Sequence, residues 1–178
     1  FTISGVREYT VEAGRADTIT EEKLVVIKEN GGKRISVNPQ TMNNKVLETI
    51  GRSHTAEQVR EAFLLARKVG FDNINTDLIA GLPSDNFESF KNTLTEVINL
   101  DPESITVHTL TLKRASSLFK EADLVSDEDI AKMVSYSVDR LCKEGYNPYY
   151  LYRQKNTLNN LENVGYAKSG KESLYNIF

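Results

Sequence analysis

A single carboxylate, Asp77, interrupts an apolar run in the segment Asn73–Pro83, Asn-Ile-Asn-Thr-Asp-Leu-Ile-Ala-Gly-Leu-Pro. The apolar residues on both sides of it predict a strand that is buried on both faces, as in a parallel sheet covered by helices. Because a buried unpaired charge is costly, Asp77 must either accept hydrogen bonds from neighbouring backbone amides or face a ligand pocket. Its position near the carboxyl end of the strand favours the pocket, since parallel sheets place their sites at that end.

Other polar residues follow the predicted strands in the same way. If the strands are parallel, their carboxyl ends lie on one rim, which collects Glu12, Gln40, Asp77 and the polar group from Thr109 to Arg114. Arg52 adds a guanidinium fork that can bind a carboxylate. Two acids, an amide and a guanidinium can together bind hydroxyls, an amino group and a carboxylate. The set therefore fits a polar, zwitterionic, nucleoside-like ligand.

Each of these residues also has a structural alternative. Glu12 could be an acid of a surface loop, and Gln40 could fix a turn after Pro39. Arg52 could cap the preceding short helix through its carbonyl groups. For Asp77 the alternative is satisfaction by backbone amides, and the sequence alone leaves both interpretations open.

The remaining reactive side chains are expected to have structural roles. His54 is expected to support the start of a helix, and His108 to be a core histidine on the face of a strand. Cys142 is expected to pack inertly on the apolar side of a long helix. The tyrosines between residues 146 and 152 are expected to belong to the core or to an interface.

Strands and helices alternate along the chain. Thr18–Glu21 and Thr55–Gln58 have capping-box spacing and predict two helix starts, the first capped by Thr18 or Thr20. Ser126 is expected to start the longest helix, and glycines predict helix ends. This rhythm is typical of right-handed βα units and predicts an α/β barrel or doubly wound sheet, of which the chain holds only a part. The expected strands start near Glu8, Lys33, Asn73, Ser104 and Tyr149, and the expected helices run to Gly31, Ile50, Gly70, Asp101 and Gly145.

The composition excludes several classes of function. A net charge of -3 and a pI near 5.5 give no electrostatic reason to expect a nucleic-acid partner. No apolar run approaches the roughly 20 residues of a membrane span. The single cysteine excludes a disulfide framework and fits a cytoplasmic protein. Because the chain begins with Phe1, without a signal peptide, we expect it to be a piece of a longer protein.

Five segments, in this order, resemble the oxygen-independent coproporphyrinogen III oxidase family of radical S-adenosylmethionine enzymes. Two further stretches, residues 150–156 and 165–170, look most like its Gram-positive coproporphyrinogen dehydrogenase branch. The five segments are Thr-Val-Glu-Ala-Gly-Arg (10–15), Arg-Ile-Ser-Val-Asn-Pro-Gln-Thr (34–41), Ile-Gly-Arg-Ser-His-Thr (50–55), Asp-Leu-Ile-Ala-Gly-Leu-Pro (77–83) and Asn-Val-Gly-Tyr-Ala (163–167).

The resemblance implies an α/β fold, a partial (β/α) barrel of the radical S-adenosylmethionine type with parallel strands, truncated on its N-terminal side. Residues 1–155 would form this barrel part, and residues 156–178 a polar C-terminal extension that packs on or beside it. In the family, a 4Fe–4S cluster and S-adenosylmethionine generate a 5′-deoxyadenosyl radical. The radical abstracts hydrogen from propionates of coproporphyrinogen III, and two oxidative decarboxylations give protoporphyrinogen IX in haem biosynthesis. An electron donor is therefore an implied partner.

The matching positions look like S-adenosylmethionine contacts. By resemblance, Arg52 would bind the methionine carboxylate and Glu12 its amino group. Gln40 and Asp77 would bind the ribose hydroxyls, and Thr111 would lie against the nucleoside.

The chain departs from the family at the cluster. The family's Cys-x3-Cys-x2-Cys loop is absent, and cluster ligation needs three thiolates where this chain has only Cys142. We therefore expect the isolated chain to bind no cluster, to be inactive, and to self-associate through open sheet edges. Two alternatives remain for the parent protein: a haem chaperone of the same superfamily, or a structural half-barrel whose rim residues bind only one another.

Overall fold

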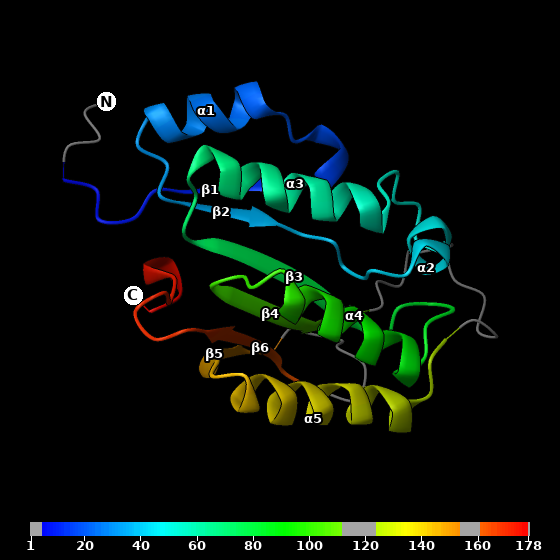
Figure 1. The fold of residues 1–178 in the computed structure, drawn as a ribbon. Helices are drawn as coiled ribbons and strands as arrows, with labels where there is room; N and C mark the ends of the chain where they lie inside the picture. The colour runs from blue at the N-terminus through cyan, green and yellow to red at the C-terminus, as the bar shows by residue number, and fades with distance from the viewer. Residues whose placement is uncertain (1–4, 112–123, 154–160, 178) are drawn as a thin grey trace.

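The computed structural model describes residues 5–111, 124–153 and 161–177. Figure 1 shows the order of the elements along the chain. The strands are β1 (Thr10–Gly14), β2 (Arg34–Val37), β3 (Ile74–Ala80), β4 (Ser104–Thr109), β5 (Asn147–Tyr152) and β6 (Asn163–Ala167). The helices are α1 (Glu21–Glu29), α2 (Asn44–Thr49), α3 (Ala56–Val69), α4 (Phe87–Asn99) and α5 (Asp127–Lys143), with short 3₁₀ helices η1 (Ala16–Thr18) and η4 (Leu174–Asn176).

The described strands form one sheet in the order β1-β2-β3-β4-β6-β5. Strands β1 to β4 are parallel neighbours, joined by α1, by α2 and α3, and by α4. This arrangement confirms the predicted α/β class and agrees with a partial barrel. The five predicted strands are all present.

Strand β6 was missed by the sequence analysis, which assigned no strand to residues 156–178. It lies between β4 and β5 and runs antiparallel to both, so β5 does not pair with β4. The sequence Asn-Val-Gly-Tyr-Ala has a weak strand pattern, with a glycine at its centre. Partners on both sides bury all five of its residues and supply the stability that local propensity lacks. The boundary expected at residue 155 lies outside the described residues.

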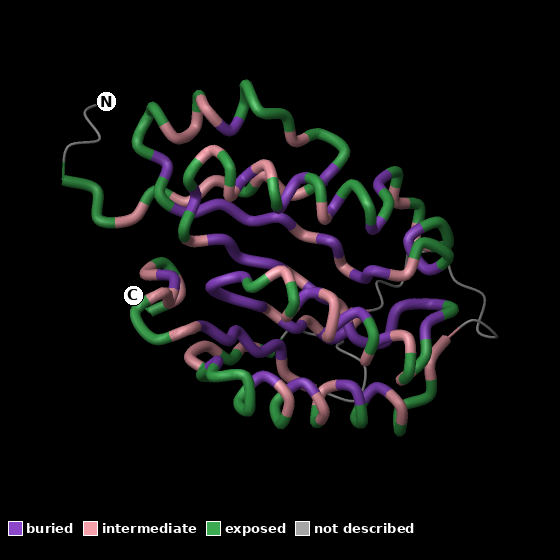
Figure 2. Tube along the Cα trace, viewed as in Figure 1, coloured by how far each residue is buried: buried purple, intermediate pink, exposed green. Residues whose placement is uncertain are grey.

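The helices cover one face of the sheet, and Figure 2 shows buried residues concentrated along the strands. Alternation along each strand separates two sets of side chains. On β3, Ile74, Leu78 and Ala80 belong to the buried apolar core, whereas Asn75 and Asp77 point to the other face. On β4 the apolar residues Ile105 and Val107 are in the core in the same way. The face opposite the helices is therefore polar.

The predicted helix starts are mostly confirmed by their caps. Thr55 and Gln58 form the complete capping box at α3, and Ser126 accepts the Asp129 amide hydrogen at α5. At α1 the cap is Thr20. Cys142 corrects one expectation: it is exposed near the end of α5 and does not pack in the core. None of the described helices combines the length and apolarity needed to cross a membrane.

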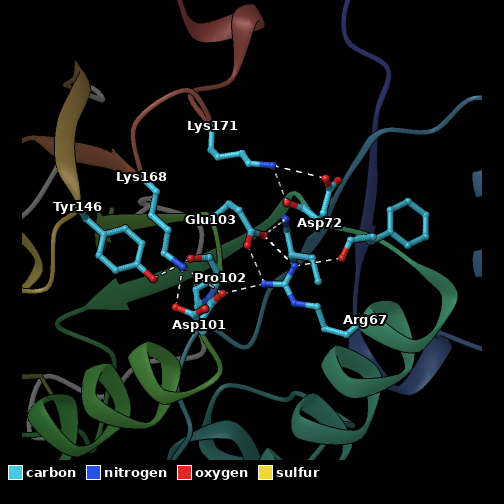
Figure 3. Close-up of polar contacts among 10 residues, drawn as sticks. Arg67, Asp72, Asp101, Pro102, Glu103, Tyr146, Lys168 and Lys171 are labelled. Atoms are coloured by element: carbon cyan, nitrogen blue, oxygen red, sulfur yellow. Dashed lines mark hydrogen bonds and ion pairs between the residues drawn. The ribbon is translucent and has the colours of Figure 1, made fainter.

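A group of charged residues joins the amino ends of β3 and β4 to the segment after β6 (Figure 3). We call it the clamp: Arg67, Asp72, Asp101, Glu103, Lys168 and Lys171. Arg67 donates two hydrogen bonds of 2.9 Å to the two carboxylate oxygens of Glu103. The same carboxylate accepts the backbone hydrogen of Ile74 at 2.8 Å. The carboxylate therefore ties α3 to the starts of both strands.

The lysines complete the clamp from the other side. Lys168 lies 2.6 Å from the Asp101 carboxylate, and Lys171 donates to the Asp72 carbonyl oxygen at 2.9 Å. Beside them, the Tyr146 hydroxyl donates to the Pro102 carbonyl oxygen at 2.7 Å. Burial raises the pKa of this hydroxyl, so it remains a donor at neutral pH. The late segment 168–171 is thus fixed to the central strands.

Candidate functional site

The polar face of the sheet lines a cavity of about 590 Å³. Because side chains on one face of a strand recur at every second residue, β1, β3 and β4 each contribute a polar pair to it. The lining residues are Glu8, Tyr9, Thr10 and Glu12 around β1, Arg34 of β2, Asn75 and Asp77 of β3, Thr106 and His108 of β4, Tyr150 and Tyr152 of β5, and Ser173, Tyr175 and Asn176 near the C-terminus.

Asp77 is held in a defined orientation at this cavity. The Asn75 side-chain amide donates to Asp77 Oδ1 at 2.7 Å. The other oxygen, Oδ2, lies 3.7 Å from His108 Nε2. The Asp77 side chain keeps 20% exposure, so the carboxylate is fixed from one side and open to the cavity on the other.

A line of hydrogen bonds runs across three neighbouring strands to Asp77. Arg34 Nη2 donates to Ser104 Oγ at 2.8 Å, and Ser104 Oγ donates to Asn75 Oδ1 at 3.1 Å. Thr106 Oγ1 also approaches Asn75 Oδ1, at 3.4 Å. With its carbonyl oxygen occupied in this way, the Asn75 amide can only donate to Asp77. The orientation of Asp77 is therefore set from β2 and β4.

Aromatic rings form another wall of the cavity. The rings of Tyr150 and Tyr152 lie 5.4 Å apart, and His108 and Tyr152 meet edge to face at 6.4 Å. Gly165 of β6 lies against this wall, where a Cβ would come into van der Waals contact with the Tyr150 ring at 3.4 Å. This wall offers an apolar surface beside the charged groups.

The C-terminal segment closes one side of the cavity. Glu8, just before β1, accepts hydrogen bonds from Ser173 Oγ at 2.9 Å and from the Leu174 backbone nitrogen at 3.0 Å. Thr10 donates to the same carboxylate at 3.0 Å. The first and last described segments therefore meet at the cavity.

Two of the five predicted site residues, Glu12 and Asp77, line the same cavity. Glu12 is exposed there and accepts a hydrogen bond from the Asn38 side chain at 3.2 Å. Gln40 adjoins Asp77 through the backbone: its amide donates to the Asp77 carbonyl oxygen at 3.1 Å, with a positive φ of 69°. This backbone arrangement agrees with the turn alternative for Gln40, whereas its side chain is not among the lining groups.

Arg52 and Thr111 do not line the cavity, so their ligand roles stay predictions. Residues 112–114 of the predicted polar group lie outside the described residues. His54, beside Arg52, is 2% exposed and lies 3.3 Å from the Pro39 carbonyl oxygen, so it ties the residue before the α3 cap to the segment after β2. Burial lowers the pKa of His54, and the nearby Arg52 charge lowers it further.

His108 corrects another expectation. It was expected in the core, but it faces the cavity beside Asp77. Arg34 and Asn75 were missed altogether as site residues. The sequence did contain a pattern that could have identified them. Each lies two residues from another polar residue of the same strand, Arg34 from Ser36 and Asn75 from Asp77, so each pair shares one face of the sheet.

Comparison with known proteins places the chain in a family. Residues 6–97 match the radical SAM superfamily, which is slightly more than half of the chain. The chain belongs to the radical SAM superfamily. The match covers β1 to α4, including Glu12, Arg34 and Asp77, so it includes most of the cavity-lining strands.

Individual radical SAM relatives match more of the chain. It is 49% identical over 178 residues to the oxygen-independent coproporphyrinogen-III oxidase-like protein HemZ of Bacillus subtilis, covering 98% of this chain and 36% of the relative. It is 34% identical to the heme chaperone HemW of Lactococcus lactis, covering 81% of this chain and 39% of the relative. The chain thus spans little more than a third of the length of the curated relatives it matches.

The structure resembles that of coproporphyrinogen III oxidase (HemN) from Escherichia coli, a radical SAM enzyme. The TM-score is 0.76 at 26% sequence identity, over 93% of this chain and 36% of that one. The resemblance to the coproporphyrinogen III oxidase family stated from the sequence is thereby confirmed. So is the radical SAM type of fold.

The superfamily implies S-adenosylmethionine and a 4Fe–4S cluster, and the cavity suits only the first. Within residues 5–111, 124–153 and 161–177, no three His, Cys, Asp or Glu side chains are placed to hold a metal ion. The single cysteine is exposed on α5. The described residues therefore do not fit a cluster. The open carboxylates of Glu12 and Asp77 do fit the hydroxyl and ammonium groups of S-adenosylmethionine.

Proposed function

We propose that the protein containing this chain is an oxygen-independent coproporphyrinogen III oxidase. It would convert coproporphyrinogen III to protoporphyrinogen IX in porphyrin biosynthesis, by oxidative decarboxylation of two propionates. The observation that carries the proposal is the polar cavity, lined by Glu12, Arg34, Asp77 and tyrosine rings, in a chain 49% identical to a coproporphyrinogen-III oxidase-like protein. Acidic groups, a guanidinium and aromatic rings suit both a zwitterionic nucleoside and a carboxylated tetrapyrrole.

The proposed roles of the residues follow their donors and acceptors. Asp77 and Gln40 would accept hydrogen bonds from ribose hydroxyls, and Glu12 would bind the methionine ammonium group. Arg52 would bind the methionine carboxylate, and Thr111 would lie against the nucleoside. When bound, S-adenosylmethionine would supply the radical chemistry of the superfamily. Asn75, which donates to the Asp77 carboxylate, orients it for this binding, and His108 lies beside it.

The rest of the proposal concerns the remainder of the protein. The cluster ligands would come from a part of the protein outside this chain, and an electron donor would reduce the cluster. We place the activity in the cytoplasm, in keeping with the single cysteine. The isolated 178-residue chain would be inactive. Its edge strands β1 and β5 would expose unpaired backbone groups and promote self-association.

A haem chaperone is the second candidate. It is favoured by the 34% identity to the heme chaperone HemW of Lactococcus lactis over 81% of this chain. The aromatic wall and Arg34 would suit haem and its propionates as well as they suit a porphyrinogen. Both candidate functions therefore involve a carboxylated tetrapyrrole. They differ because the oxidase converts it to a product, whereas the chaperone only binds it.

The deciding experiment uses the full natural protein that contains this chain, reconstituted anaerobically with iron and sulfide. It is incubated with coproporphyrinogen III, S-adenosylmethionine and a reductant, and products are separated by chromatography. Formation of protoporphyrinogen IX with release of CO₂ is expected. Failure to form it, together with stoichiometric haem uptake, would replace the oxidase by the chaperone.

A further inference from the structure

Arg34 is a buried cation without a carboxylate partner among the described residues. Only 5% of the residue is exposed, yet it lines the cavity. Its one hydrogen bond among the described residues goes from Nη2 to the neutral hydroxyl of Ser104. Nε is buried without an acceptor, and no described carboxylate lies within 4.0 Å of the guanidinium. Burying a charge without an opposite charge lowers the stability of the fold, so Arg34 is not explained by a contribution to stability.

The acids nearest along the sheet already have other donors. Asp77 accepts from Asn75 and lies beside His108, and the hydrogen-bond line through Ser104 separates it from Arg34. Glu8 is occupied by Thr10 and Ser173. Ser104 in turn fixes the guanidinium through Nη2, while Nε has no acceptor among the described residues. This is the arrangement expected of an anion site prepared before its ligand arrives.

The shape of the cavity limits the kind of anion. The Tyr150 and Tyr152 rings on its wall provide an apolar surface. A free inorganic anion would leave these rings unused, whereas an aromatic or heterocyclic carboxylate would use both features. The guanidinium and a carboxylate can form two parallel hydrogen bonds.

We propose that Arg34, positioned by Ser104, is a carboxylate-binding subsite that takes a carboxylate side chain of the substrate while the tyrosine rings contact its ring system. The subsite lies at the start of β2 and is distinct from the Asp77 end of the cavity. Its substrate class rests on the proposed function, under which the carboxylate is a propionate of a tetrapyrrole. Haem offers the same group, so the assignment applies to both candidate functions.

The first test measures binding of coproporphyrin III and of its tetramethyl ester to the full natural protein, by fluorescence titration. Arg34→Met should weaken binding of the acid by about tenfold to a hundredfold, the range for a lost charged hydrogen bond. Binding of the ester, which has no carboxylate, should stay unchanged. Equal losses for acid and ester, an unchanged affinity for the acid, or no binding of the acid by the wild type would each overturn the subsite.

A second test needs no tetrapyrrole. Without ligand, Arg34→Met should have a melting temperature equal to or above that of the wild type, because it removes an uncompensated buried charge. Arg140→Met, at the exposed Arg140–Glu144 pair, is the matched control and should change little. A clear fall in melting temperature for Arg34→Met, beyond that of the control, would make Arg34 structural and overturn the proposal.

The outcomes separate the subsite from the proposed reaction. If the protein forms no protoporphyrinogen but Arg34→Met still weakens binding of the acid, the reaction fails and the subsite stands. If product forms with the same KM in the wild type and in Arg34→Met, the reaction stands and the subsite fails.

Discussion

The clamp and the cavity lie along the same strands but differ in how their arginines are paired. In the clamp, Arg67 and Glu103 satisfy each other through two hydrogen bonds, and Lys168 meets Asp101 (Figure 3). In the cavity, the more buried Arg34 donates to a serine hydroxyl and has no carboxylate among the residues that the structure describes. Charges that hold this fold together are paired within the chain, whereas an unpaired buried charge has no value for stability. The difference therefore separates structural arginines from a ligand-binding one.

The largest expected effect comes from breaking the clamp at Glu103. Glu103→Ala removes the acceptor for Arg67 and for the Ile74 amide, and should lower the free energy of unfolding by about 3 kcal/mol. Urea unfolding monitored by circular dichroism measures this. The control is Glu128→Ala at the exposed Lys132–Glu128 pair, which should cost less than about 0.5 kcal/mol. Equal losses for the two variants would mean that the clamp is no stronger than a surface pair.

A smaller effect is expected at the outer part of the clamp. Lys168→Met removes the ion pair with Asp101, whose side chain is 79% exposed. Because solvent screens this pair, the loss should be about 0.5 kcal/mol. The same unfolding measurement in 0.1 M and 1 M salt should show the Lys168 contribution shrinking with salt, as Debye screening requires. A loss of stability as large as that of Glu103→Ala would mean that the Lys168–Asp101 pair stabilises the fold as much as the Arg67–Glu103 pair does, which would contradict this prediction.

The smallest effect is expected at His54, a buried side chain whose lowered pKa favours its neutral form and so avoids the cost of a buried charge. Burial lowers the pKa of His54, so below the ordinary value of 6.5 the unfolded chain binds a proton that the folded chain does not. This contribution to stability is fully present above pH 6.5 and is lost as the pH falls toward the lowered pKa. His54→Gln should flatten the dependence of the free energy of unfolding on pH between 7.5 and 5. Parallel curves for wild type and variant would contradict the assignment.

Local patterns predicted much of the fold. The capping box at Thr55 and the strand starting near Ser104 were predicted from local features, and both are confirmed. Strand β6 could not be predicted in this way, because its stability comes from β4 and β5 on either side. Cys142 was misplaced because it adjoins the buried Leu141 in sequence while pointing to the opposite, solvent-facing side of α5.

Two residues of the candidate cavity were predicted from local patterns. Asp77 was found because it interrupts an apolar run, and Glu12 because it lies at the carboxyl end of an expected strand; both line the cavity. Arg34 was not singled out, because in the sequence it looks like Arg67: each is an arginine between a lysine and an apolar residue. The tertiary structure shows the difference: within the part of the chain that it describes, Arg67 has a carboxylate partner and Arg34 has none. Local sequence patterns do not show which charged residues from distant segments form ion pairs.

The central claim is that the cavity at Asp77 binds S-adenosylmethionine and is not merely a polar face. The most direct measurement compares the S-adenosylmethionine affinity of the full natural protein with that of its Asp77→Asn variant, with Asp139→Asn on the exposed side of α5 as the control. The proposal predicts a loss of about tenfold to a hundredfold for Asp77→Asn alone, with little change in the free energy of unfolding. Unchanged affinity together with reduced stability would contradict it and leave Asp77 a structural residue.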